Sequence, residues 1–181
     1  MAANQLQFLV QSNSQPPDRR DFLVIGYGNT LRGDDGVGPR VAEAIEKLNL
    51  PGVRTLICQQ LSPEYADPVS RAHTVVFVDA EIVQGSKFKV QSSGIPDPEP
   101  ATLSRELIRL RKLEPGESSQ LMAHAADPRT MLALARDVFG HAPQAWWLTI
   151  PAVKLDFSET LTPEAQRGFE MALEKIRELC R

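Results

Sequence analysis

The chain has few of the side chains that build covalent or metal frameworks. Its 181 residues include two cysteines, Cys58 and Cys180, and three histidines. Two cysteines cannot form a disulfide framework or a four-cysteine zinc site. We expect both to be reduced thiols in a cytoplasmic protein, with Cys58 contributing to packing at the end of a strand.

Long apolar runs and an excess of basic charge are also absent. No apolar stretch approaches the ~20 residues that a membrane helix needs. The amino terminus has no basic start followed by an apolar segment, so no secretory signal is expected. The formal net charge of −3 implies no broad basic surface for nucleic acid. We therefore expect no membrane partner and no nucleic-acid partner.

Two common catalytic signatures are missing as well. No G-x-S-x-G surrounds a serine, so covalent acyl-enzyme chemistry has no visible carrier. A dinucleotide-binding G-x-G-x-x-G would need glycine where Leu31 stands, and no Gly-Lys-Ser/Thr follows the loop. These departures argue against a nucleotide-binding protein.

The most informative stretch present is residues 22–38. It opens with a continuous apolar run, Phe22 to Ile25, which is typical of a strand buried on both faces. Five glycines with polar residues between them come next, and apolar residues then recur at helical spacing from Val37. In open α/β sheets, ligands gather at the carboxyl ends of strands, where this loop would lie.

The loop carries two adjacent carboxylates, Asp34 and Asp35. Like charges at close range make a poor anion site, whereas a carboxylate pair suits a cation or a proton transfer. A purely structural role, in which one of them caps the following helix, is an open alternative.

Strands alternating with helices predict a three-layer α/β/α sandwich with a twisted, mostly parallel sheet of five or six strands. Residues 1–20 are expected to be a flexible extension and residues 21–181 a single α/β domain. Asp127-Pro128 is typical of a helix start and Gly140 of its end. The remaining expected strands are 53–58, 74–78, 87–91 and 145–150, and the remaining expected helices are 61–72, 101–113 and one that begins at Thr162.

Three side chains could meet in one site. Asp35 follows the first strand and Asp79 ends the third, so a parallel sheet places both at the same rim, whereas His124 lies in an irregular segment. Oxygen and nitrogen donors with open positions suit a divalent metal such as zinc or nickel. Their spacing is no specific metal signal, and loop-capping acids with an incidental histidine are an open alternative. His73 should lie at the opposite rim, and His141 should be solvated.

The sequence resembles the nickel–iron hydrogenase maturation endopeptidases. The resemblance covers residues 21–181 and rests on these residues: Gly26-Tyr27-Gly28-Asn29, Leu31, Asp34-Asp35-Gly36-Val37-Gly38, Asp79, His124 and Leu161-Thr162-Pro163. Three features depart from the family pattern. Ala123 stands where many relatives have a hydroxyl residue, residues 155–160 contain no glycine, and the segment 95–117 is longer than in compact relatives.

The resemblance implies a single-domain α/β hydrolase, expected to be a monomer. It would remove the C-terminal extension of the hydrogenase large-subunit precursor after nickel insertion. Asp35, Asp79 and His124 would be the catalytic and metal-contacting residues. Nickel would be supplied by the precursor, with another divalent ion such as zinc or cadmium in its place in vitro. Substrate contacts would come from the loop, at Gly28, Asn29, Asp34 and Gly36.

Two further functions stay open from the sequence alone. The missing nucleophile is compatible with a non-cleaving, nickel-dependent chaperone that binds the large subunit. A nucleotide-binding α/β protein of another class is a third candidate, although Leu31 and the two acids argue against it.

Overall fold

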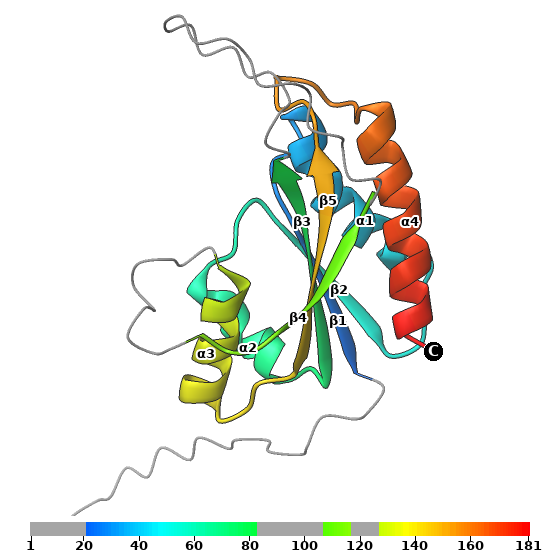
Figure 1. The fold of residues 1–181 in the computed structure, drawn as a ribbon. Helices are drawn as coiled ribbons and strands as arrows, with labels where there is room; N and C mark the ends of the chain where they lie inside the picture. Colours follow the sequence, from blue (N-terminus) through cyan, green and yellow to red (C-terminus); the bar gives the residue numbers. More distant parts are fainter. Residues whose placement is uncertain (1–20, 83–106, 117–126) are drawn as a thin grey trace, which may run out of the picture.

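A twisted five-stranded sheet forms the centre of the molecule (Figure 1). The computed structural model describes residues 21–82, 107–116 and 127–181. The strand order is β2-β1-β3-β5-β4, and every neighbouring pair is parallel except β4 with β5. The strands are β1 (Phe22–Tyr27), β2 (Val53–Cys58), β3 (Thr74–Ile82), β4 (Arg109–Leu113) and β5 (Gln144–Ala152).

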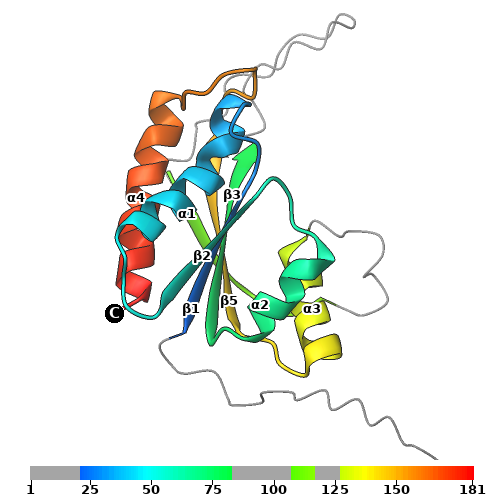
Figure 2. The same cartoon turned by 180° about the vertical axis from the view of Figure 1, so that it is seen from behind.

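Helices cover both faces of the sheet, as Figures 1 and 2 show from opposite sides. One face packs against α1 (Val37–Lys47) and α4 (Pro163–Leu179), the other against α2 (Ala66–Ser70) and α3 (Pro128–Phe139). Short 3-10 turns, η1 (Gly33–Gly36) and η2 (Pro63–Tyr65), precede α1 and α2. The predicted three-layer, mostly parallel α/β sandwich is therefore confirmed.

Strand β1 contributes to both cores. All six of its residues are buried, with Leu23, Ile25 and Tyr27 on the α2/α3 face and Phe22 and Val24 on the α1/α4 face. A continuous apolar run is therefore required, because each face of this strand packs under helices.

Two helix starts follow the local sequence signals. Asp127 caps α3 by accepting a hydrogen bond from the backbone N–H of Arg129 at 2.8 Å, and Gly140 ends that helix with a φ of +78°. Thr162 caps α4 by accepting from the backbone N–H of Ala165 at 3.3 Å. Each cap satisfies an amide that the helix itself leaves unpaired.

The helix expected over residues 101–113 is wrong for its second half. Residues 109–113 form the antiparallel edge strand β4, whose register pairs Arg109 with Thr149 and Leu113 with Ala145. Side chains of the strand point alternately to the two faces of the sheet, and its two leucines reach different cores: Leu110 packs on the α1/α4 side and Leu113 on the α2/α3 side. Pairing with β5 outweighs the helical spacing of the leucines. The expected strand 87–91 lies outside the described residues.

The sheet has a topological switch point between β1 and β3, because β1 pairs with β2 on one side and with β3 on the other. The last β1–β3 pair is Gly26 with Val78, whereas β3 continues beside β5 as far as Ile82. A crevice outside the strand ends at such a point is the usual ligand site of an open α/β sheet. Within the described ranges, no helix combines the length and apolar character that crossing a membrane requires.

Candidate functional site

Asp35 lies in the glycine-rich loop where β1 leaves the sheet. Its carboxylate Oδ2 accepts a hydrogen bond from the backbone N–H of Asn29 at 3.0 Å, and the Asn29 side chain accepts from the backbone N–H of Leu31 at 3.0 Å. The partly buried Asp35 side chain therefore links the end of the glycine-rich loop to its start at Asn29. Neither η1 nor α1 has a side-chain cap, so the helix-cap interpretation of the acid pair is wrong.

A close backbone contact brings this loop against β3. A Cβ atom at Gly38 would lie 2.5 Å from the carbonyl oxygen of Val78 and 2.6 Å from that of Tyr27. The first turn of α1 therefore rests directly on the ends of β1 and β3, because no side chain separates them. This contact sets Asp35, three residues before Gly38, beside Asp79, one residue after Val78.

Replacing Gly38 with alanine should push α1 away from the sheet. We expect the free energy of unfolding to fall by about 1–3 kcal/mol, since an inserted methyl group meets backbone atoms that cannot rotate away. Urea unfolding measures the change. Gly116→Ala is the matched control, because its Cβ would meet nothing closer than 3.5 Å. Equal stabilities for the two variants would contradict this packing argument.

Asp79 stands one residue beyond the last β1–β3 pair, on the face that carries Tyr27. Its Oδ1 accepts a hydrogen bond from the backbone N–H of Ala80 at 2.8 Å. Burial is the main cause that raises the pKa of Asp79 to about 6; the Tyr27 hydroxyl and the Ala80 N–H oppose it, while the charges of Asp35 and Glu81 add to it. A carboxyl group with this pKa can hold or release a proton near neutral pH.

The raised pKa makes a prediction about stability. Asp79 stabilises the fold below its unfolded pKa of 3.8, and this contribution is lost as the pH rises through about 6. Asp79→Asn removes the titration, so its stability relative to wild type should increase from about pH 4 to about pH 7 by up to about 3 kcal/mol. Urea unfolding at a series of pH values measures this. A difference that stays constant with pH would contradict it.

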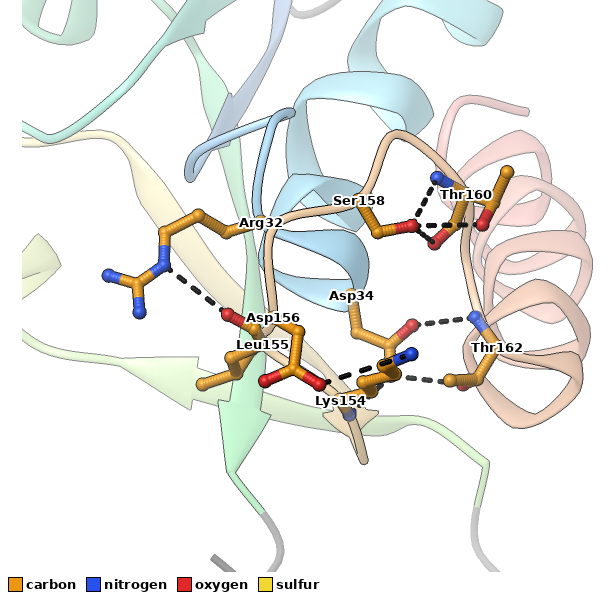
Figure 3. Close-up of polar contacts among 8 residues, drawn as sticks. All are labelled: Arg32, Asp34, Lys154, Leu155, Asp156, Ser158, Thr160 and Thr162. Atoms are coloured by element: carbon orange, nitrogen blue, oxygen red, sulfur yellow. Dashed lines mark hydrogen bonds and ion pairs between the residues drawn. The ribbon is translucent and has the colours of Figure 1, made fainter.

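Asp34, the neighbouring acid, is fully buried and connects the glycine-rich loop to the loop between β5 and α4 (Figure 3). Its carboxylate accepts hydrogen bonds from the backbone N–H groups of Val153 (2.8 Å), Lys154 (3.0 Å) and Thr162 (2.7 Å), and from the Thr162 hydroxyl (2.9 Å). Backbone bonds join the same loops, including Gly33 N–H to the carbonyl of Ser158 at 2.7 Å. This geometry gives Asp34 a structural role and does not support the expected substrate contact.

Comparisons with known proteins agree on the architecture. No family model matches the chain. A curated protein of Methanocaldococcus jannaschii, provisionally described as a hydrogenase maturation protease, is 27% identical over 163 residues, which cover 88% of this chain and 98% of that protein. The hydrogenase maturating endopeptidase HybD of E. coli superposes with a TM-score of 0.58 at 19% identity, covering 87% of this chain and 90% of HybD. The [NiFe] hydrogenase maturation protease HycI of Thermococcus kodakarensis gives 0.60 at 19% identity, covering 89% and 92%.

The chain has the fold of the hydrogenase maturation endopeptidases. The resemblance identified from the sequence is thereby confirmed at the level of the fold. The two acids lie near the switch point between β1 and β3, but the expectation that Asp79 ends its strand is wrong, because β3 continues beside β5 to Ile82. Their catalytic roles stay predictions.

Gly28 and Gly36, two of the expected substrate contacts, are needed for the conformation of the glycine-rich loop. Gly28 has a φ of +134°, and a Cβ there would lie 2.0 Å from the carbonyl oxygen of Asp35. Gly36 faces Thr30, whose Cα would be 2.7 Å from an added Cβ. Both glycines are therefore required by the loop itself, and their substrate contacts stay predictions.

The structure describes two of the three histidines, His73 and His141. His124 lies outside the described residues, and among those that are described no three His, Cys, Asp or Glu side chains gather closely enough to hold a metal. His73 precedes β3 at the rim opposite the acids, as expected. His141 is partly buried, and its Nε2 atom is buried without a hydrogen-bond partner among the described residues, so the prediction of a solvated side chain is wrong.

Sequence reasoning did not consider Tyr27, which lies beside Asp79, as a site residue. Tyr27 is 7% exposed, and burial followed by the charge of Asp79 raises the pKa of its phenol far above the usual range. Trp147 packs against the same core from β5, while Trp146 packs on the opposite face. Its place in the sequence could have identified it, because Tyr27 is the last residue of the apolar first strand and directly precedes the glycine-rich loop.

Proposed function

We propose that this chain is a cytoplasmic, monomeric endopeptidase that removes the C-terminal extension of a nickel–iron hydrogenase large-subunit precursor after nickel insertion. The observation that supports this most strongly is the pair of carboxylates, Asp35 and Asp79, beside each other at the switch point of a fold whose relatives are described as hydrogenase maturation proteases. The nickel belongs to the precursor and serves as the mark that insertion is complete.

The two acids suit a divalent ion in the substrate. Asp79 is desolvated and has the like charge of Asp35 nearby, and a cation between the two carboxylates would relieve both costs. Oxygen donors of this kind, completed by an imidazole, fit nickel, and zinc or cadmium would occupy the same donors in vitro.

His124 is our proposed third donor. The charge of Asp127, the first residue described after the gap, reaches the Tyr27 phenol, so the start of α3 lies on the same side of the sheet as Asp79. His124 is three positions before Asp127, and three steps of extended chain span at most about 10 Å. The length of the chain therefore permits His124 to join the two acids.

The chemistry follows from these donors. A divalent ion supplies Lewis-acid polarisation of the scissile carbonyl and lowers the pKa of a nearby water. A carboxylate of the pair that does not contact the ion is the group we assign to move a proton between water and the leaving amine. The glycine-rich loop lets the substrate backbone approach closely at Gly28 and Gly36, and the Asn29 side chain donates a hydrogen bond to it.

Intact-mass spectrometry of the precursor tests this proposal. The protein is incubated with a nickel-loaded large-subunit precursor and, separately, with the same precursor prepared without nickel. We expect only the nickel-loaded chain to become shorter, by the mass of one C-terminal peptide. Stable binding with an unshortened chain would instead support the non-cleaving chaperone. Shortening of both precursors would contradict nickel recognition.

A further inference from the structure

Two buried polar side-chain atoms lie on the α2/α3 face of the sheet, which also carries Asp79. They are the hydroxyl oxygen of Tyr27 and the indole Nε1 of Trp147, and neither has a partner among the described residues. Buried polar groups are almost always paired, so two unpaired donors near one carboxylate need an explanation. The cost of leaving each one unpaired is large enough that proteins rarely tolerate it without a functional reason.

The sheet register places these groups on one face. Gly26 pairs with Val78, so Tyr27 and Asp79 come next along the two neighbouring strands. On the other side of β3, Asp79 pairs with Thr149 and Phe77 pairs with Trp147. Because side chains two residues apart share a face, Tyr27, Asp79 and Trp147 all point toward the α2/α3 layer.

The indole ring is held from its outer side. The guanidinium carbon of Arg111, on the edge strand β4, lies 5.0 Å from the centre of the Trp147 ring, within the range of a cation–π contact. The ring therefore has contacts with two neighbouring strands, its own β5 and the edge strand β4. A fixed donor of this kind can orient the next group in a hydrogen-bonded chain.

Electrostatics gives the order of the three groups. Trp147 lowers the pKa of the Tyr27 phenol, which is the effect of an N–H donating to the phenol oxygen. Tyr27 in turn lowers the pKa of Asp79 against the larger effect of burial, which is the effect of an O–H donating to the carboxylate. The groups are thus close enough to influence one another, although they do not meet hydrogen-bond geometry in this conformation.

We propose that Trp147, Tyr27 and Asp79 form a hydrogen-bonded chain in the working enzyme, in which Tyr27 is a positioning residue. The indole N–H donates to the phenol oxygen, and the phenol O–H donates to the Asp79 carboxylate. One chain satisfies both buried donors. With the Ala80 N–H already on Oδ1, it fixes the rotation of the carboxylate toward the loop that carries Asp35. This role rests on the proposed function, because it matters only if Asp79 acts in cleavage.

Tyr27→Phe is the variant that tests the chain, because it removes the hydroxyl and keeps the ring. The matched control is Tyr65→Phe, which changes the one other tyrosine, on η2. The first readout is NMR of the two indole N–H signals, assigned with Trp146→Phe, together with the side-chain carboxyl carbon of Asp79. We expect Tyr27→Phe to move the signals of Trp147 and Asp79, and Tyr65→Phe to move neither.

The second readout is cleavage of the nickel-loaded precursor. Loss of one hydrogen bond to a charged carboxylate should lower kcat about tenfold with KM nearly unchanged. Unmoved NMR signals would overturn the chain. Moved signals with wild-type kcat would overturn the positioning role. If Tyr27→Phe does not fold, Asp79→Asn must move the Trp147 signal, and an unmoved signal there would overturn the proposal. An inactive wild-type protein would defeat the proposed function, while the NMR result would still decide whether the chain forms.

Discussion

Asp79→Asn is expected to slow cleavage of the nickel-loaded precursor by at least about 100-fold, a typical loss when a positioned acid or base is removed. The amide keeps the shape of the carboxylate and can still accept the Ala80 N–H, so the fold should persist. It loses both the negative charge that a divalent ion needs and the ability to transfer a proton. Because the buried charge is also removed, the variant should combine lost activity with equal or greater stability at neutral pH.

The control for this variant is Asp156→Asn, which removes an acid from the nearby β5–α4 loop. Its side chain is 69% exposed and makes a 3.9 Å ion pair with Lys154. We expect it to cleave at the wild-type rate. Initial rates from intact-mass time courses compare the two variants. Wild-type cleavage by Asp79→Asn would remove Asp79 from the mechanism.

Asp34→Ala is expected to destabilise the protein more than any other single carboxylate substitution discussed above, by about 3–5 kcal/mol. The methyl group leaves three backbone N–H groups and the Thr162 hydroxyl without their acceptor inside the protein. These donors belong to the loop between β5 and α4, so the start of α4 should loosen together with the glycine-rich loop. Cleavage should fall as well, because Asp35 is the next residue.

Urea unfolding of Asp34→Ala measures this cost, and Asp156→Ala is the matched control on the same loop. The exposed control should change the free energy of unfolding by less than about 0.5 kcal/mol. A fall of under about 1 kcal/mol in Asp34→Ala would mean that water replaces the lost acceptor easily. In that case the two loops would not depend on Asp34.

The parts of the fold that the sequence predicts well are those with local signals. The apolar run of β1, the Asp127-Pro128 start of α3 and the Gly140 end each depend on residues close in sequence. Their physical causes, burial on both faces and satisfaction of terminal amides, act over a few residues. Such features can therefore be identified without knowing what packs against them.

Strand β4 could not be identified in this way. Its backbone hydrogen bonds go to β5, and its leucines divide between two cores that other elements build. A short segment rich in Leu and Arg has high helix propensity, and only the distant partner decides against a helix. The leucine spacing was a real pattern, but tertiary pairing determined the structure.

The neighbouring acids show the same limit at the candidate site. Asp34 and Asp35 are indistinguishable by type, yet Asp34 is bonded to residues 119–128 positions away, whereas Asp35 bonds within its own loop. The turn η1 and the loop before α4 together determine which of these two acids lies at the carboxyl-terminal rim of the sheet. The sequence could therefore place an acid at the rim, but it could not tell the structural carboxylate from the candidate catalytic one.

We propose that Asp35, Asp79 and His124 meet around one divalent ion. A crystal structure grown with cadmium, with its anomalous difference map, tests it most directly. We predict one anomalous peak between the two carboxylates, with the His124 imidazole as a further ligand. A His124 side chain on the far side of the molecule from the two acids, with no hinge that could return it, would contradict the account.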